Sequence, residues 1–258
     1  MRTPRLLFLL LVPSIVIAAC ARTSSSSSAN EGIDAGTKTI TVGASGPKTG
    51  PNAAFGEGTT AAQAEADYYN ANGGVNGWKI KYVTLDDGYI PANAIAAAHR
   101  LVDQEHVFAI VGEVGTPNGT AILPYMVQSG TPDIGFSLQT GSIAAKYKDA
   151  RNLFGFQIPY AQIAAFDMDS LSSQLHVNTV SLAYQNDEVG EAVLPGMQYG
   201  ASKNHINLAE TVPVPDNATD FSGYAAKLKA ANAPWVIGWL PPAELAGLVR
   251  TCASIGYR

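Results

Sequence analysis

The 258-residue chain carries little charge and little cysteine. Charged residues make up 14% of it, the formal net charge is -5, and there are two Cys. No block of Lys and Arg stands out, and clustered basic residues are what a protein needs to neutralise nucleic-acid phosphates. Outside the N-terminus no apolar run is long enough to span a bilayer. These absences argue against a nucleic-acid-binding protein and against a multi-span membrane protein.

Catalytic and metal-binding motifs are also missing from the sequence. There is no P-loop, no Gly-x-Ser-x-Gly elbow, and no Cys or His cluster with metal-ligand spacing. Residues 56–61 formally match a dinucleotide-binding fingerprint, but about ten residues separate them from the preceding strand, so the tight strand–turn–helix geometry is absent. We therefore predict that the chain is not an enzyme, with no catalytic residue, no metal site and no cofactor.

The N-terminus has the pattern of a targeting segment. Arg2 and Arg5 give it a positive start, and residues 6–19 form an apolar run of signal-peptide length. The run ends in residues 17–20, Ile-Ala-Ala-Cys, which resemble a bacterial lipobox. The resemblance implies that residues 1–20 are a lipoprotein signal peptide and that Cys20 becomes the lipid attachment site. The alternative is an ordinary signal peptide with a chance Cys.

A serine-rich segment follows at residues 21–37, with five consecutive serines at 24–28. Such a composition buries no apolar surface, so we predict a flexible tether. Cys252, the second cysteine, has no intrachain partner once Cys20 is lipidated, and we predict a half-buried structural thiol in a helix.

From residue 39 onward, short β-branched runs alternate with longer Ala-rich helical runs. This alternation predicts an α/β fold in which parallel sheets are covered by helices on both faces. The rhythm restarts near residue 160, which predicts two lobes, at 38–158 and 159–258. The second lobe offers about three strand–helix units against four or more in the first, so we expect it to be truncated. The helices are predicted at 58–71, 91–104, 117–129, 141–147, 161–175, 189–202, 220–231 and 243–255.

One long segment resembles a known family. The segment reads Gly-Pro-Lys-Thr-Gly at 46–50, Asn-Ala-Asn-Gly-Gly-Val-Asn-Gly-Trp at 70–78, Leu-Asp-Asp at 85–87 and Phe-Ala-Ile-Val-Gly at 108–112. In order and spacing these motifs resemble the branched-chain amino acid-binding (leucine/isoleucine/valine-type) family of ABC transporter receptors, and a weaker match covers nearly all of 39–258.

The resemblance implies a two-lobed type I periplasmic-binding fold, in which a ligand is captured by closure of the lobes without chemistry. It further implies an extracytoplasmic solute-binding protein that takes a small amino acid-like, amide or carboxylate ligand. Its partners are then that ligand, a membrane permease, and the membrane itself through the lipid anchor; the protein is expected to be a monomer.

Five residues match the family's ligand-binding positions. Thr116 matches a hydroxyl residue that holds the ligand carboxylate, and the loop that contains it opens a helix, whose free N–H groups favour anions. A simple N-cap role is the alternative for this threonine. Ser137 and Gln139 match positions at the polar ends of the ligand, Phe55 matches an aromatic pocket wall, and Val189 stands where tyrosine is frequent. Because the residues at 139 and 189 depart from the pattern, amides, urea-like compounds and aromatic acids stay open as ligands.

Two conspicuous motifs have structural interpretations. The glycines at 73–77 supply positive φ and a tight helix stop. Asp86 and Asp87 are neighbours on a strand end, so their side chains point to opposite faces, and a turn role is favoured over a catalytic pair. Three functional alternatives remain: a sensor module of the same fold, a secreted α/β enzyme, and a non-functional truncated paralogue.

Overall fold

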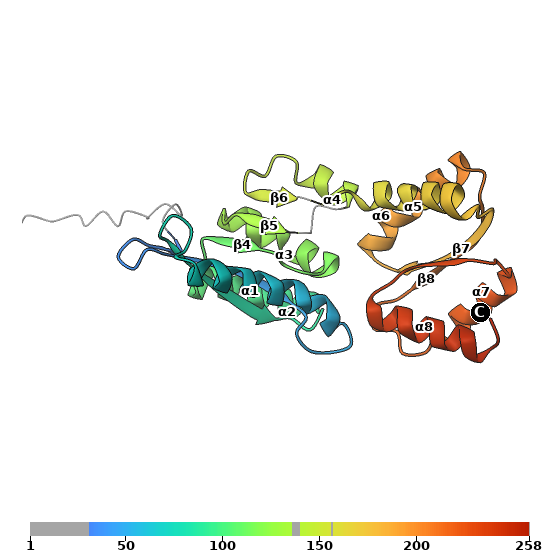
Figure 1. Cartoon of the computed structure of the whole chain (residues 1–258), viewed down its shortest axis with the longest axis horizontal. Coiled ribbons are helices and arrows are strands. Elements are labelled where there is room, and N and C mark those ends of the chain that lie inside the picture. Colours follow the sequence, from blue (N-terminus) through green and yellow to red (C-terminus); the bar gives the residue numbers. More distant parts are fainter. Residues whose placement is uncertain (1–30, 136–139, 156, 258) are drawn as a thin grey trace, which may run out of the picture.

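The chain folds into two α/β lobes that lie side by side (Figure 1). A computed structural model describes residues 31–135, 140–155 and 157–257. The chain passes from the first lobe to the second between strand β6 and helix α5, at residues 157–159. None of the helices within the described ranges is long and apolar enough to cross a membrane.

The first lobe is built on a sheet in which β2 is central. Strand β2 pairs in parallel with β3 and β4, β5 and β6 continue the parallel sheet beyond β4, and β1 pairs antiparallel with the start of β2. The strands are β1 (Ile33–Asp34), β2 (Thr39–Gly46), β3 (Lys79–Asp86), β4 (Ala109–Val111), β5 (Asp133–Gly135) and β6 (Leu153–Gly155).

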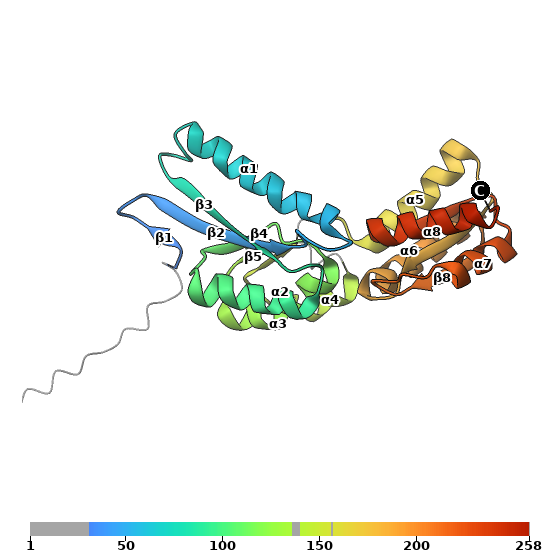
Figure 2. The ribbon, with the colours of Figure 1, turned by 90° about the horizontal axis from the view of Figure 1, so that it is seen from below.

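Helices cover both faces of this sheet. Figure 2 shows α1 on one face and α2 with α3 on the other. The core beneath α2 and α3 is aliphatic, with Leu101, Ile110, Leu123 and Met126 almost fully buried. The helical elements are the 3₁₀ turn η2 (Ala53–Gly56), α1 (Glu57–Ala71), α2 (Pro91–His99), its π-helical continuation η3 (Arg100–Gln104), α3 (Thr116–Ser129) and α4 (Gly141–Lys146).

The second lobe repeats the plan with three parallel strands in the order β8-β7-β9. Helices α5 and α6 lie on one side of this sheet and α7 and α8 on the other (Figure 1). The elements are α5 (Tyr160–Leu175), β7 (Thr179–Gln185), α6 (Glu188–Lys203), β8 (Asn207–Val214), α7 (Ser222–Ala231), β9 (Val236–Trp239) and α8 (Pro242–Ser254).

Helices α5 and α6 pack backbone against backbone through glycines. A Cβ atom on Gly196 would lie 2.2 Å from the Ala161 carbonyl oxygen, and one on Gly200 would lie 2.7 Å from Met168 Cβ. Two larger residues at these positions would force the helices apart. The close approach therefore joins the first turn of α5 firmly to the body of the second lobe.

The predicted alternation of strands and helices is confirmed, and so is the α/β fold. The glycine-rich turn after α1 has the positive φ values expected of it, at Gly73, Gly74 and Gly77. A Cβ on Gly74 would lie 2.1 Å from the Trp78 carbonyl oxygen, so no other residue fits there without a shift. Pro91 occupies the first turn of α2 as predicted.

The structure corrects the position of the tether. Residues 31–37, which we predicted as part of it, include strand β1, which joins the first sheet: Ile33 pairs with Ile40, and the Thr41 N–H donates to the Gly32 carbonyl at 2.7 Å. The Asp34 carboxylate closes the following turn by accepting bonds from the N–H groups of residues 36 and 37. The sequence analysis did not detect this two-residue strand, because its pairing with β2 depends on backbone hydrogen bonds and leaves no apolar periodicity in the sequence.

Candidate functional site

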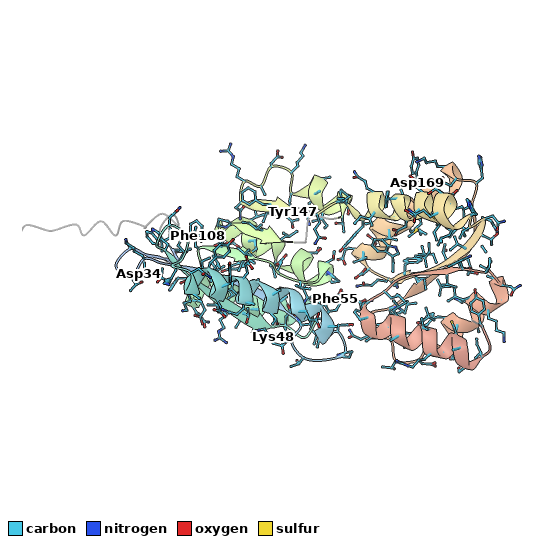
Figure 3. All side chains as sticks on the ribbon, in the orientation of Figure 1. Asp34, Lys48, Phe55, Phe108, Tyr147 and Asp169 are labelled. Carbon is cyan, nitrogen blue, oxygen red and sulfur yellow. The ribbon has the colours of Figure 1, made fainter. Side chains whose placement is uncertain are left out.

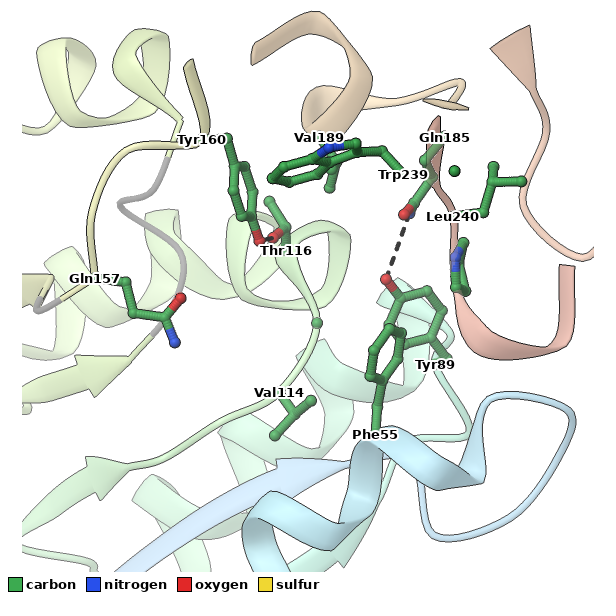
Figure 4. Close-up of a pocket in the computed structure, with 13 residues that line it drawn as sticks. Phe55, Tyr89, Val114, Thr116, Gln157, Tyr160, Gln185, Val189, Trp239 and Leu240 are labelled. Atoms are coloured by element: carbon green, nitrogen blue, oxygen red, sulfur yellow. Dashed lines mark hydrogen bonds between the residues drawn. The ribbon is translucent and has the colours of Figure 1, made fainter. Parts of the chain in front are cut away.

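A cavity of about 360 Å³ lies between the two lobes. It is bordered by the carboxyl ends of strands from both sheets, the edge where open α/β sheets bind ligands. The first lobe and the connection to the second contribute Phe55, Tyr89, Val114, Gly115, Thr116 and Gln157. The second lobe contributes Tyr160, Gln185, Val189, Gly238, Trp239, Leu240 and Pro241 (Figure 4).

Two pairs of aromatic rings form walls of the cavity. The rings of Phe55 and Tyr89, both from the first lobe, have centroids 5.5 Å apart with 34° between their planes. In the second lobe, Tyr160 and Trp239 meet edge to face, with centroids 5.7 Å apart. Phe55 stands at the end of the first lobe that faces the second (Figure 3). The cavity is therefore lined mostly by apolar and aromatic surface, as small-molecule sites are.

Tyr89 is held in place by an unusual backbone. Its φ is +63°, a left-handed conformation that is rare for a bulky residue. Its N–H donates to Asp87 Oδ1 at 2.9 Å. Gly115, whose own φ is +110°, lies directly against the ring: a Cβ there would lie 2.9 Å from Tyr89 Cε2. The aspartate and the glycine thus fix the position of one wall.

Both aspartates at the end of β3 act in turns, as predicted. Asp87 positions Tyr89, while Asp86 accepts hydrogen bonds from the N–H groups of Lys48 and Thr49 and from the Thr49 hydroxyl. These bonds, with that of the hydroxyl the strongest, lower the pKa of Asp86. The two carboxylates serve different loops and do not form a catalytic pair.

Thr116 joins the two lobes through its hydroxyl. Thr116 Oγ1 lies 2.8 Å from the Tyr160 hydroxyl, which belongs to the first residue of α5. The threonine is itself the first residue of α3, and Gly115 is the N-cap, so the alternative in which Thr116 is a simple N-cap is wrong. Burial raises the pKa of Tyr160, so its hydroxyl stays protonated and able to donate.

Gln185 makes a second link between the lobes. Its Nε2 lies 3.4 Å from the Tyr89 hydroxyl and also donates to Asp187 Oδ2. Asp187 in turn caps α6, because its Oδ1 accepts the N–H of Val189 at 2.8 Å. The amide of Gln185 is thereby held at the border of the cavity between a tyrosine and a carboxylate.

Acidic groups stand behind this border. Burial, followed by the charge of Asp216, raises the pKa of Asp187 to about 7. Burial, followed by the charge of Glu244, raises the pKa of Asp216 to about 6. The pKa of Tyr89 is raised above its ordinary value, mainly by burial, with contributions from both aspartates. None of the thirteen lining residues named above is itself Asp, Glu, Lys or Arg.

Three of the predicted ligand residues, Phe55, Thr116 and Val189, line the cavity. Ser137 and Gln139 lie outside the described residues, as does the lipid attachment site Cys20. That the three lining residues contact a ligand stays a prediction. Cys252 is a free, partly buried thiol, in agreement with the sequence analysis.

Sequence reasoning did not assign the other ten lining residues to the site, among them Tyr89, Tyr160, Gln185 and Trp239. A usable signal existed for three of them, because Gln185 and Trp239 end strands of the second sheet and Tyr89 follows the end of β3. Within the described ranges, no group of three or more His, Cys, Asp or Glu is arranged to hold a metal ion.

Comparison with known protein families shows which family this chain is related to. The family described as "Periplasmic binding protein" matches residues 39–258. The chain belongs to this family. Among curated relatives, the Leu/Ile/Val-binding protein of Escherichia coli is 26% identical over 230 residues, which cover 85% of this chain and 59% of the relative. An amino acid binding protein of Pseudomonas aeruginosa is 51% identical over 75 residues, covering 28% of this chain and 20% of the relative.

Solved structures of this periplasmic binding protein class share the fold. A solute-binding protein of an R. palustris ABC transporter, solved in complex with 4-hydroxybenzoate, matches with a TM-score of 0.73 and 24% identity, over 84% of this chain and 58% of that one. The branched-chain amino acid transporter substrate-binding protein of Streptococcus pneumoniae, in complex with isoleucine, matches with a TM-score of 0.72 and 22% identity, over 85% and 62%. The chain spans about 60% of the length of most of these relatives.

Proposed function

We propose that this periplasmic binding protein is the receptor of an ABC transporter and captures a small solute between its lobes. The observation that carries the proposal is the interlobe cavity. Its walls come from the carboxyl ends of strands in both sheets, and its volume and lining suit a small molecule. A site built from two lobes has an obvious binding mechanism, because rotation of one lobe against the other opens and closes it.

The lining favours a ligand with an apolar body and a few polar atoms. Four aromatic rings and Val189 supply apolar surface, while the Thr116 hydroxyl and the amides of Gln157 and Gln185 supply the polar contacts. Phe55, Thr116 and Val189 are proposed ligand residues, and Ser137 and Gln139 complete the set by their resemblance to the family pattern. Isoleucine and 4-hydroxybenzoate, the ligands of two structural relatives, are both of this kind.

The proposed location is outside the cytoplasm, which agrees with the periplasmic family. The lipobox-like residues 17–20 support a lipid anchor at Cys20, and the serine-rich segment that follows supports a tether between lipid and protein. A receptor held at the membrane in this way would deliver its ligand to a permease. We propose that it does so as a monomer.

A thermal-shift screen tests the receptor function. The full chain, purified in mild detergent, is heated with amino acids, amides, small carboxylates and small amines. A ligand at one hundred times its Kd stabilises the folded state by about 2.7 kcal/mol, which for a chain of this size raises Tm by roughly 5–10 °C. The expected result is such a shift with one chemical class.

Matched variants locate the binding site. Phe55→Leu removes a cavity wall and is expected to abolish most of the ligand-induced shift. Phe166→Leu changes a side chain on α5 that is 67% exposed and does not line the cavity, so its shift should equal that of the unmodified chain. A folded protein that shifts with no class of solute, or equal shifts in both variants, would contradict the proposal.

A further inference from the structure

We propose that the ligand bears an alkylated ammonium group, held among the rings of Phe55, Tyr89, Tyr160 and Trp239. The proposal deepens the receptor function and rests on it. It names the chemical class of the ligand, a small organic cation or zwitterion, and it follows from two features of the cavity that are independent of each other: the arrangement of the rings and the distribution of charge.

Four aromatic rings line the cavity. Two come from each lobe and border the same space (Figure 4). The centroid separations within the two pairs are 5.5 and 5.7 Å, and all four rings line the cavity. The face of an aromatic ring is electronegative, and a cation within about 6 Å of a ring centroid is attracted to it, most strongly by Trp. A methylated ammonium is broad, weakly hydrated and suited to several rings at once.

Charge points to the same kind of ligand. Asp187 accepts a hydrogen bond from the amide of Gln185, a residue that lines the cavity. Asp216 lies close enough to Tyr89 for its charge to raise the pKa of the Tyr89 hydroxyl. Neither aspartate takes part in an ion pair among the described residues. Behind them Glu244 is 2% exposed; its Oε1 accepts the Asn217 N–H at 2.9 Å and its Oε2 has no partner.

Asp187, Asp216 and Glu244 therefore follow the carboxyl ends of β7, β8 and β9, at the edge of the sheet that borders the cavity. No Lys or Arg lines the cavity to balance them. At pH 8, above the pKa values of about 7 and about 6 for Asp187 and Asp216, these two groups are ionised and attract a cation through the low-dielectric wall. The same field opposes a ligand that carries only negative charge.

A pair of probes that differ in one atom tests the proposal. Glycine betaine carries a trimethylammonium group and a carboxylate, and 3,3-dimethylbutanoate is its neutral-headed carbon isostere. Calorimetric titration of the full chain at pH 8 is expected to show that glycine betaine binds at least about tenfold more tightly than the isostere, since ring and carboxylate attraction act on the cation alone. L-isoleucine and 4-hydroxybenzoate serve as reference solutes.

Variants separate the contributions. Trp239→Leu is expected to lower glycine betaine affinity at least tenfold. Asp216→Asn is expected to lower it several-fold and to tighten binding of the isostere, because the removed carboxylate repels an anion. Phe166→Leu should change neither. Because the comparison of the two probes needs no variant, it remains decisive even if Trp239→Leu fails to fold.

Equal or tighter binding of 3,3-dimethylbutanoate overturns the inference. So does binding of isoleucine or 4-hydroxybenzoate without glycine betaine, and in that case the receptor function stands. Binding of no solute in the whole screening panel overturns the inference and the receptor function together.

Discussion

Asp133 provides a test of the buried electrostatics that does not depend on any ligand. It opens strand β5, is 3% exposed, and its Oδ1 has no hydrogen-bond partner. A Cβ placed on Gly135 would lie 2.8 Å from this oxygen and 2.8 Å from Glu113 Oε1, so two buried carboxyl groups share one small space. Burial raises the pKa of Asp133 from its ordinary 3.8 to about 7.

The sign of the pH effect follows from proton counts. Between 3.8 and about 7 the folded state binds more protons at Asp133 than the unfolded state does. The free energy of unfolding therefore falls as pH rises through this window, and is flat with respect to this group outside it. The window spans about three pH units at about 1.4 kcal/mol each, so ionised Asp133 costs the folded state on the order of 4 kcal/mol at pH 8.

We predict that Asp133→Asn removes most of this cost. The variant should be more stable than the unmodified chain at pH 8, by as much as a few kcal/mol, and the difference should shrink toward pH 5. Urea unfolding at several pH values measures it. Asp149→Asn, which removes an exposed carboxyl, is the matched control. Parallel profiles for Asp133→Asn and the unmodified chain would refute the reasoning.

Three further substitutions have expected outcomes. Gly115→Ala places a Cβ against the Tyr89 ring in a left-handed backbone. The strain of about 1–3 kcal/mol should lower Tm by several degrees, and ligand-induced shifts of Tm should disappear. Unchanged ligand-induced shifts would contradict the assignment of Tyr89 to the cavity wall. Thr116→Ala should weaken the best ligand about tenfold by calorimetry, and unchanged affinity would remove Thr116 from the site. Gly32→Ala, whose Cβ would lie 2.2 Å from the Phe108 nitrogen, should lower Tm, whereas Gly223→Ala, in open space on α7, should not.

The sequence predicts the fold well because alternation of strand and helix is a local pattern repeated along the chain. Runs such as residues 107–111 and 179–184 are short, apolar and β-branched, and each is followed by a helical run of the right length. Local patterns of this kind determine which faces are buried. The two-residue strand β1 escaped detection because it has no such pattern and exists through its partner alone.

The site was predictable only in part, and for a physical reason. Residues in loops that open a helix, such as Thr116, carry a recognisable signal. Tyr89 reaches the cavity through a left-handed backbone and the support of a distant glycine, which no periodicity encodes. Tyr160 and Trp239 become neighbours by the packing of α5 beside β9, a contact between residues 79 positions apart in the sequence.

The glycine-mediated packing of α5 on α6 has a mechanical consequence. Because Gly196 brings the two backbones together at Ala161, the residue after Tyr160, the first turn of α5 cannot bend independently of the second lobe. Residues 157–159 connect the two lobes in the part of the chain that the structure describes. Tyr160, Gln185 and Trp239, which stand on α5 and on the paired strands β7 and β9, therefore move together with the second lobe relative to the wall that the first lobe provides.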